Sequence, residues 1–270
     1  MTSSDIEWVE DNHEFGHQEI VHHNESSSRD ISYIMKFDYV EIDQEIQLRG
    51  KSQIFKSTGL TLWTSSQVLS GYLIDNPNLV KGKRVLELGA GMGLCGIVAH
   101  YLGSAHVCAT DGDVKVLDNL RYNLKLNGLR GHSNPDHAAK CGKGMREISC
   151  HQLIWDNDLK KFEDIHGKFS VIMGTDIFYA SESIEPLWNT VNALLAPDGL
   201  FLLAFATHKV SIFQVLDKAT QLGFIWENPN ISDNTEDEKD DDDDYLGNCT
   251  FGYHIFIFQR KVDHRIEERE

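Results

Sequence analysis

The residues with the clearest chemical potential in this sequence are three glycines that follow a short apolar run. The segment VLELGAGMG, residues 85–93, places Gly89, Gly91 and Gly93 at alternate positions. Glycine lets a chain turn sharply and lets its backbone approach a ligand more closely than a side chain would allow. A helix predicted over residues 94–102 would begin with free backbone N–H groups facing that ligand. The pattern is typical of a site for a nucleotide-type cofactor.

The same letters fit two cofactor signatures. Gly91, Gly93 and Gly96 match G-x-G-x-x-G, which is typical of dinucleotide sites. Glu87 followed by the alternate glycines matches E-x-G-x-G-x-G, a signature of S-adenosylmethionine sites. Asp111 ends the next apolar run, where a carboxylate would take the ribose hydroxyls of either cofactor. A tight turn between strand and helix, without any ligand, is the structural alternative.

Charge and composition limit the partner. The 270 residues are 41% hydrophobic, which is enough for one sizeable core, and carry a formal net charge of −17. A strongly acidic chain is a poor match for nucleic acid, which is held through its phosphates. Part of the charge is local, because residues 233–244 hold nine acidic residues and one lysine. We therefore expect a basic or neutral macromolecular partner, such as a protein with a basic surface, and no nucleic acid.

Other features bear on location and metals. No apolar run approaches the roughly 20 residues of a membrane span, and the acidic N-terminal segment lacks a targeting pattern. The five cysteines are odd in number and include no C-x-x-C pair, which indicates free thiols in a reducing compartment. We expect a cytoplasmic monomer with no membrane partner, the nucleus being an open alternative. No ligand cluster has zinc-type spacing, so no metal is expected.

The elements that must position the glycine loop begin with an N-terminal region. Residues 1–29 lack periodicity and predict a disordered tail. Residues 30–58 alternate loosely between apolar and polar and predict a β-hairpin. A helix should then start near Thr64 or Ser65.

Strands and helices alternate after this helix. Strands are predicted over residues 84–88, 106–110, 148–154, 169–174, 200–206, 224–227 and 251–261, and helices over residues 94–102, 114–127, 183–195 and 211–222. This order predicts an α/β, doubly wound sheet within one domain, residues 30–262. Residues 128–147 interrupt it as a surface insertion, and residues 230–247 form an acidic loop between the last two strands. These strands should pair antiparallel, which favours the S-adenosylmethionine signature, because dinucleotide folds usually have six parallel strands.

Three more features fall near the carboxyl ends of predicted strands, where open α/β sheets bind ligands. Trp63 lies just before the leading helix, Trp155 follows the third strand, and TDIFY, residues 175–179, follows the fourth. With the glycine loop and Asp111, they make the sequence resemble the class I, seven-strand, Rossmann-like methyltransferases, and within them methyltransferase family 16, the protein-lysine type.

The resemblance extends from about Tyr33 to Lys261. The family's patterns are matched by Gly59 with Trp63, by Ile154 with Trp155, and by Asp176 with Tyr179 in a D-x-x-Y motif. It implies an S-adenosylmethionine-dependent protein-lysine N-methyltransferase that acts on a specific folded protein. The residues it assigns to the cofactor are Trp63, Glu87, Gly89, Ala90, Gly91, Gly93, Asp111, Trp155 and Thr175. Asp176 and Tyr179 are assigned to catalysis, as groups that orient and hold the attacking amine.

Several alternatives stay open. Glu87 could equally be a buried structural carboxylate, and Asp176 could cap the following helix with Tyr179 packed against it. Thr175 stands where relatives often have alanine or serine, and the segment ATHKVS lacks the arginine often found there. These departures leave the substrate undefined. Protein-histidine or small-molecule methylation, a non-catalytic cofactor-binding module and a NAD-type oxidoreductase are the competing functions.

Overall fold

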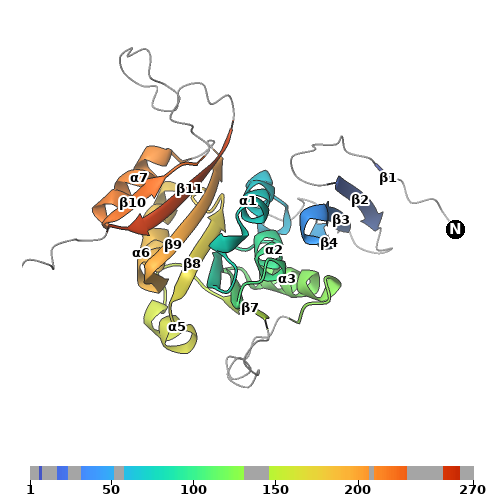
Figure 1. Cartoon of the computed structure of the whole chain (residues 1–270), viewed down its shortest axis with the longest axis horizontal. Coiled ribbons are helices and arrows are strands. Elements are labelled where there is room, and N and C mark those ends of the chain that lie inside the picture. The colour runs from blue at the N-terminus through green and yellow to red at the C-terminus, as the bar shows by residue number, and fades with distance from the viewer. Residues whose placement is uncertain are drawn as a thin grey trace, which may run out of the picture.

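The main body of the protein is a seven-stranded mixed sheet with helices on both faces, beside a smaller four-stranded antiparallel sheet (Figure 1). This computed structural model describes residues 6–7, 17–23, 32–51, 58–130, 146–206, 210–229 and 252–261, with side chains from residue 32 onward. Among these residues, no helix has both the length and the hydropathy needed to cross a membrane.

The large sheet has the strand order β10-β11-β9-β8-β5-β6-β7. Its strands are β5 (Arg84–Leu88), β6 (His106–Asp111), β7 (Glu147–Gln152), β8 (Phe169–Thr175), β9 (Leu195–Ala206), β10 (Phe224–Glu227) and β11 (Tyr253–Arg260). Neighbouring strands from β7 to β9 pair in parallel, whereas β11 pairs antiparallel with both β9 and β10. The predicted doubly wound sheet with a terminal antiparallel pair is therefore confirmed.

Helices cover the two faces of this sheet. They are α1 (Thr64–Asp75), α2 (Leu94–Tyr101), α3 (Val114–Leu126), α5 (Leu159–His166), α6 (Ile184–Leu194) and α7 (Ile212–Gln221), with short 3₁₀ helices η1 (Val40–Ile42), η2 (Thr58–Leu60), η3 (Pro77–Leu79) and η4 (Ser181–Ser183). Strand side chains alternate between faces, so Val85 packs with α1, α2 and α3 while Leu86 packs with α5, α6 and α7. Each face therefore has its own apolar core.

Helix α5 is absent from the sequence-based prediction. Its eight residues, LKKFEDIH, bury only Phe162, so they lack the repeated apolar positions that predict a helix. Strand β9 begins at Leu195, earlier than the predicted residue 200. The prediction was late because the first residues of β9 include PDG, a sequence typical of turns.

The small sheet contains β1 (Ile6–Glu7), β2 (His17–His23), β3 (Ser32–Tyr39) and β4 (Gln44–Lys51), in that order. The predicted hairpin is confirmed as β3 and β4. The prediction of a disordered tail over residues 1–29 is wrong for β1 and β2, since β2 pairs with β3 along its whole length. Backbone hydrogen bonds hold these strands in the sheet, and such bonds cannot be predicted from hydrophobic periodicity. The rest of the predicted tail lies outside the described residues.

Three asparagines attach the small sheet to the main body. Asn119 and Asn123 lie four residues apart on one face of α3, and Asn127, the residue at its C-terminal cap, continues the same row. Asn127 accepts a hydrogen bond from the N–H of Gln47 (2.9 Å) and donates to its carbonyl (2.7 Å). Asn123 accepts from the N–H of Arg49 (2.8 Å), and Asn119 donates to its carbonyl (2.8 Å). The side-chain amides thus take the place of a partner strand along β4.

Two predicted segments are largely beyond what can be described. Of the predicted insertion, residues 128–147, only the ends belong to the described ranges. The predicted acidic loop, residues 230–247, lies outside them. The structure therefore tests neither prediction.

Candidate active site

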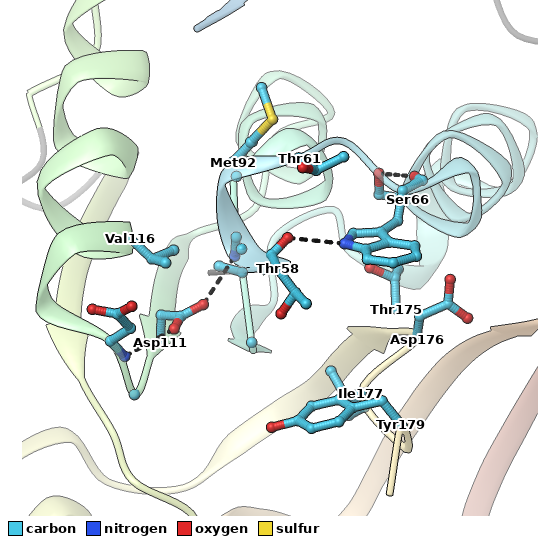
Figure 2. Close-up of a pocket in the computed structure, with 18 of the residues that line it drawn as sticks. Thr58, Thr61, Ser66, Met92, Asp111, Val116, Thr175, Asp176, Ile177 and Tyr179 are labelled. Carbon is cyan, nitrogen blue, oxygen red and sulfur yellow. Dashed lines mark hydrogen bonds between the residues drawn. The ribbon is translucent and has the colours of Figure 1, made fainter. Parts of the chain in front are cut away.

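A cavity of about 500 Å³ opens at the carboxyl ends of β5, β6 and β8. This volume is within the usual range for small-molecule sites. Among its lining residues are Trp63, Gly89, Ala90, Gly91, Gly93, Asp111, Trp155, Thr175, Asp176 and Tyr179. Every predicted site residue except Glu87 therefore contributes to one cavity. Figure 2 shows Asp111 on one side of it, and Asp176 and Tyr179 on the other.

The glycine loop forms the central wall of the cavity. Gly91 and Gly93 have φ angles of 54° and 88°, which side chains other than glycine rarely adopt. A Cβ on Gly93 would lie 2.2 Å from Cδ1 of Leu120, so glycine is also required for space. The N–H of Ala90 donates to the carbonyl of Thr110 (2.8 Å), which ties the loop to β6. The loop therefore has the backbone shape that a close approach to a ligand requires.

Asp111 is held rigidly at the end of β6. Its Oδ2 accepts a hydrogen bond from the N–H of Gly91 (3.1 Å), and its Oδ1 accepts one from the N–H of Asp113 (3.0 Å). Burial raises the pKa of Asp111, and hydrogen bonds from these two N–H groups oppose that rise. Each carboxylate oxygen keeps a second lone pair, so the group can still accept hydrogen bonds from a diol.

Aromatic side chains surround the opposite end of the cavity. The indole N–H of Trp63 donates to the carbonyl of Thr58 (3.0 Å), which fixes the ring just before α1 (Figure 2). The rings of Trp155 and Tyr179 lie 6.1 Å apart between centroids and are tilted by 49°. Tyr179 is 55% exposed and Ile154 is 53% exposed. A large partner could reach this apolar rim.

Asp176 connects two elements behind the aromatic rim. Its Oδ2 accepts a hydrogen bond from the hydroxyl of Ser65 in α1, and its Oδ1 accepts one from the N–H of Ala206 in β9 (2.9 Å). Its φ of 50° is left-handed, which asparagine and aspartate tolerate better than most residues. The following helices η4 and α6 have no side-chain cap, so the alternative role of Asp176 as their cap is wrong.

Glu87 lies outside the cavity wall, beneath α2. The backbone N–H of Gly96 hydrogen-bonds to its carboxyl group, and Oε2 is buried without a hydrogen-bond partner among the described residues. A Cβ on Gly96 would lie 2.5 Å from this oxygen, so glycine lets the helix pack against the carboxyl group. Burial raises the pKa of Glu87 from 4.5 to about 8, which keeps most of it uncharged near neutral pH. This position matches the buried structural carboxylate that the sequence left open.

Several cavity residues were missed by sequence reasoning. Thr58 and Thr61 come from the segment around η2, Met92 from the glycine loop and Val116 from α3 (Figure 2). Their types carry no chemical signature, and only the fold brings them to the cavity. Met92 is fixed from outside, because its carbonyl accepts a hydrogen bond from the amide of Asn123 (3.0 Å).

Comparison with known proteins identifies a matching family and several relatives. The family model described as lysine methyltransferase matches residues 42–219. The protein N-terminal and lysine N-methyltransferase EFM7 of Yarrowia lipolytica is 27% identical over 70% of this chain and 71% of its own length. The protein-lysine N-methyltransferase EFM3 of Chaetomium thermophilum is 34% identical over 60% of this chain and 47% of its own length. METTL21A of Mus musculus, a protein N-lysine methyltransferase, is 34% identical over 53% of this chain and 58% of its own length.

Solved structures share the fold at lower identity. The 16S rRNA methyltransferase RsmC of T. thermophilus has a TM-score of 0.51 and 15% identity, and covers 84% of this chain and 51% of its own. A SAM-dependent methyltransferase from Agrobacterium tumefaciens has a TM-score of 0.51 and 11% identity, with 83% and 69% covered. At these identities the likeness concerns the fold alone.

Proposed function

The chain belongs to the lysine methyltransferase family, and from this membership we propose that it transfers a methyl group from S-adenosylmethionine to a lysine side chain of a folded protein. It is an S-adenosylmethionine-dependent methyltransferase by family and fold. The observation that carries the proposal for this chain is a single cavity with two ends. A carboxylate beside a glycine loop occupies one end, and a fixed carboxylate with exposed aromatic rings occupies the other.

The residues at the first end fit the cofactor. When bound, S-adenosylmethionine supplies a methyl group activated by a positively charged sulfur. Asp111 would accept hydrogen bonds from the ribose hydroxyls, since both its oxygens are already aligned by backbone N–H groups. Gly91 leaves backbone exposed to the ligand, and Trp155 and Trp63 offer flat apolar surfaces to its uncharged parts.

The residues at the second end fit an amine acceptor. A lysine must lose its proton and be aligned before it can attack a methyl carbon, so positioning supplies much of the rate enhancement. Asp176 is held from two sides by Ser65 and Ala206, which lets its carboxylate orient the amine without moving. The faces of Trp155 and Tyr179 can hold a cationic or methylated nitrogen by cation–π attraction.

The rim and the charge support a protein as acceptor. Tyr179, Ile154 and Trp63 are partly exposed where the cavity opens, and a small molecule would not need such a rim. The net charge of −17 suits a partner with a basic surface better than a nucleic acid. We further propose that the protein acts as a cytoplasmic monomer. Methylation of histidine or of a small molecule remains the competing chemistry.

Incubation of a cell extract with the enzyme and methyl-labelled S-adenosylmethionine tests this proposal. We expect label in one or a few proteins, and hydrolysis of these proteins should release methylated lysine. Label recovered as methylated histidine, or confined to the small-molecule fraction, would contradict lysine specificity. An enzyme carrying Asp176→Asn, incubated in parallel, separates its own activity from that of enzymes in the extract.

A further inference from the structure

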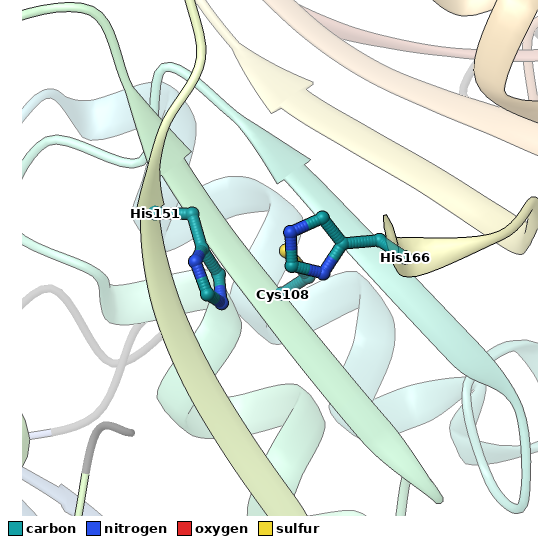
Figure 3. A group of neighbouring side chains, drawn as sticks. All are labelled: Cys108, His151 and His166. Carbon is teal, nitrogen blue, oxygen red and sulfur yellow. The ribbon is translucent and has the colours of Figure 1, made fainter. Parts of the chain in front are cut away.

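Three side chains with metal-binding chemistry meet away from the cavity. Cys108 of β6, His151 of β7 and His166 at the end of α5 each offer a ligand atom, and these atoms all lie within 4.8 Å of one another. Figure 3 shows the two imidazole rings next to one another, with the sulfur of Cys108 behind the ring of His166 in this view. The cluster sits between the large sheet and α5, on the face opposite Glu87 and α2.

The fold explains why this cluster could not be recognised in the sequence. Cys108 is the register partner of Ser149 on the neighbouring strand, and His151 lies two residues further along, so its side chain points to the same face. Helix α5 then returns over the sheet and brings His166 to the same place. The three residues come from three elements, so they lack the short spacing by which zinc ligands are recognised in a sequence.

The donor set suits a zinc-type ion. Zinc binds cysteine sulfur and histidine nitrogen, and three such protein ligands can be completed by a water molecule as the fourth, with bonds of about 2.3 Å to sulfur and 2.0–2.1 Å to nitrogen. Cys108 is fully buried, whereas His151 and His166 are partly exposed, which leaves room for water on one side. Because the three ligand atoms all lie within 4.8 Å of one another, binding at those distances would require them to move closer together.

The histidines are available as ligands. Their rings lie 4.4 Å apart between centroids, and within the described part of the chain neither ring nitrogen of either residue has a hydrogen-bond partner. Burial lowers the pKa of His151 to about 4, so its ring is neutral near pH 7 and keeps a free lone pair. Burial also lowers the pKa of His166, as does the guanidinium of Arg84, which donates a hydrogen bond to the carbonyl of His166.

The cysteine would balance the charge of the ion. Burial raises the pKa of Cys108 to about 12, so the free protein carries the thiol, whose sulfur is near the hydroxyl of Ser149. Binding of a divalent ion would form a metal–sulfur bond and release the thiol proton to solvent. The resulting thiolate offsets one of the two positive charges beside Arg84.

We propose that Cys108, His151 and His166 bind one zinc-type ion that stabilises this edge of the sheet. The ion would join β6, β7 and α5, and α5 otherwise buries only Phe162. His151 and His166 also bracket the segment that carries Trp155, so the ion would limit the motion of one wall of the cavity. This proposal concerns structure and does not depend on the proposed methyl transfer.

Titration of the metal-free protein with Co²⁺ under reducing, oxygen-free conditions tests the site. We expect one equivalent of cobalt to give the visible spectrum of a tetrahedral ion together with a thiolate-to-cobalt charge-transfer band. Both signals should be lost in Cys108→Ser and kept in Cys150→Ser, a control that alters a buried cysteine on the opposite face of β7. Zn²⁺ should raise the unfolding temperature of the wild type and of the control only.

His151→Gln and His166→Gln provide a second test, because both side chains are partly exposed and the variants should fold even if Cys108→Ser does not. Each should weaken Co²⁺ binding at least tenfold without changing the circular dichroism of the metal-free protein. The proposal would be overturned if the wild type lacked the charge-transfer band, or if both histidine variants bound Co²⁺ as tightly as the wild type. These outcomes are independent of catalysis, so they leave the proposed function untouched.

Discussion

Two carboxylates near the glycine loop show how strongly local environment sets the behaviour of a residue. Asp111 accepts hydrogen bonds from two backbone N–H groups and faces the cavity, whereas Glu87 has an unpaired oxygen beneath α2. The sequence predicted the position of Asp111 because an acidic residue at the end of a strand is a strong signal. It could not decide between two roles for Glu87, because burial depends on how closely α2 packs at Gly96.

Glu87 should make stability depend on pH. The folded-state pKa of Glu87, about 8, is above the ordinary 4.5. The stability that the protonated Glu87 contributes is therefore fully present below pH 4.5 and is lost as pH rises toward 8. We expect Glu87→Gln to gain stability relative to the wild type by about 1.4 kcal/mol per pH unit across this window. Urea unfolding of both proteins at several pH values measures the difference. Parallel pH profiles would show that Glu87 is charged in the folded protein.

Asp176 should affect turnover more than cofactor binding. Asp176→Asn keeps the shape and can still accept a hydrogen bond from Ala206, but it loses the negative charge that orients an amine. We expect kcat to fall by about tenfold or more, which corresponds to about 1.4 kcal/mol per tenfold, with little change in the Kd for S-adenosylhomocysteine. If kcat is unchanged, Asp176 only joins α1 to β9.

At the scale of elements, hydrophobic periodicity predicted the strands and helices with large buried faces. It failed for α5, which buries one side chain, and for β2, which is held by backbone pairing. The attachment of β4 to α3 could not be predicted from the sequence either. Three asparagines on a helix look like an ordinary polar face, and their role becomes clear only when the edge of β4 lies against them.

The asparagines should differ in their effect on the cavity. Asn123 is buried and supports both Arg49 in β4 and the carbonyl of Met92 in the cavity wall, whereas Asn127 bonds to Gln47 in β4 and within α3. We expect Asn123→Ala and Asn127→Ala each to lose about 1–3 kcal/mol of unfolding free energy, because buried backbone groups lose their hydrogen-bond partners. Only Asn123→Ala should also weaken binding of S-adenosylhomocysteine. Thermal unfolding and calorimetry measure the two effects, and equal cofactor affinity in both variants would contradict the link to Met92.

At the scale of the whole molecule, the order of strands was predictable because alternating strands and helices allow few arrangements. The terminal antiparallel strand followed from the strong alternation of residues 253–257. The cavity could be predicted only in part, since its upper wall comes from η2 and α3. The metal-ligand cluster could not be predicted, because it depends on how three elements meet.

The acidic segment should act on association with the substrate. Residues 233–244 lie outside the described ranges, so this prediction rests on their charge alone. We expect replacement of residues 240–244 by serine and glycine to raise KM for the protein substrate at low salt while leaving cofactor affinity unchanged. The difference should shrink near physiological salt, where the screening length falls from about 30 Å to about 8 Å. The same KM for both proteins at every ionic strength would mean that the segment only connects β10 to β11.

We infer that the cavity beside the glycine loop holds S-adenosylmethionine through Asp111. Calorimetric titration with S-adenosylhomocysteine tests it most directly, with NAD as the competing ligand. We expect the wild type to bind S-adenosylhomocysteine only, and Asp111→Ala to lose about 1.5–3 kcal/mol of binding free energy, because a charged hydrogen-bond acceptor is removed. Asp118→Ala, which removes the same charge from the exposed face of α3, should bind like the wild type. Tighter binding of NAD, or unchanged affinity for S-adenosylhomocysteine in Asp111→Ala, would show that Asp111 does not hold this cofactor.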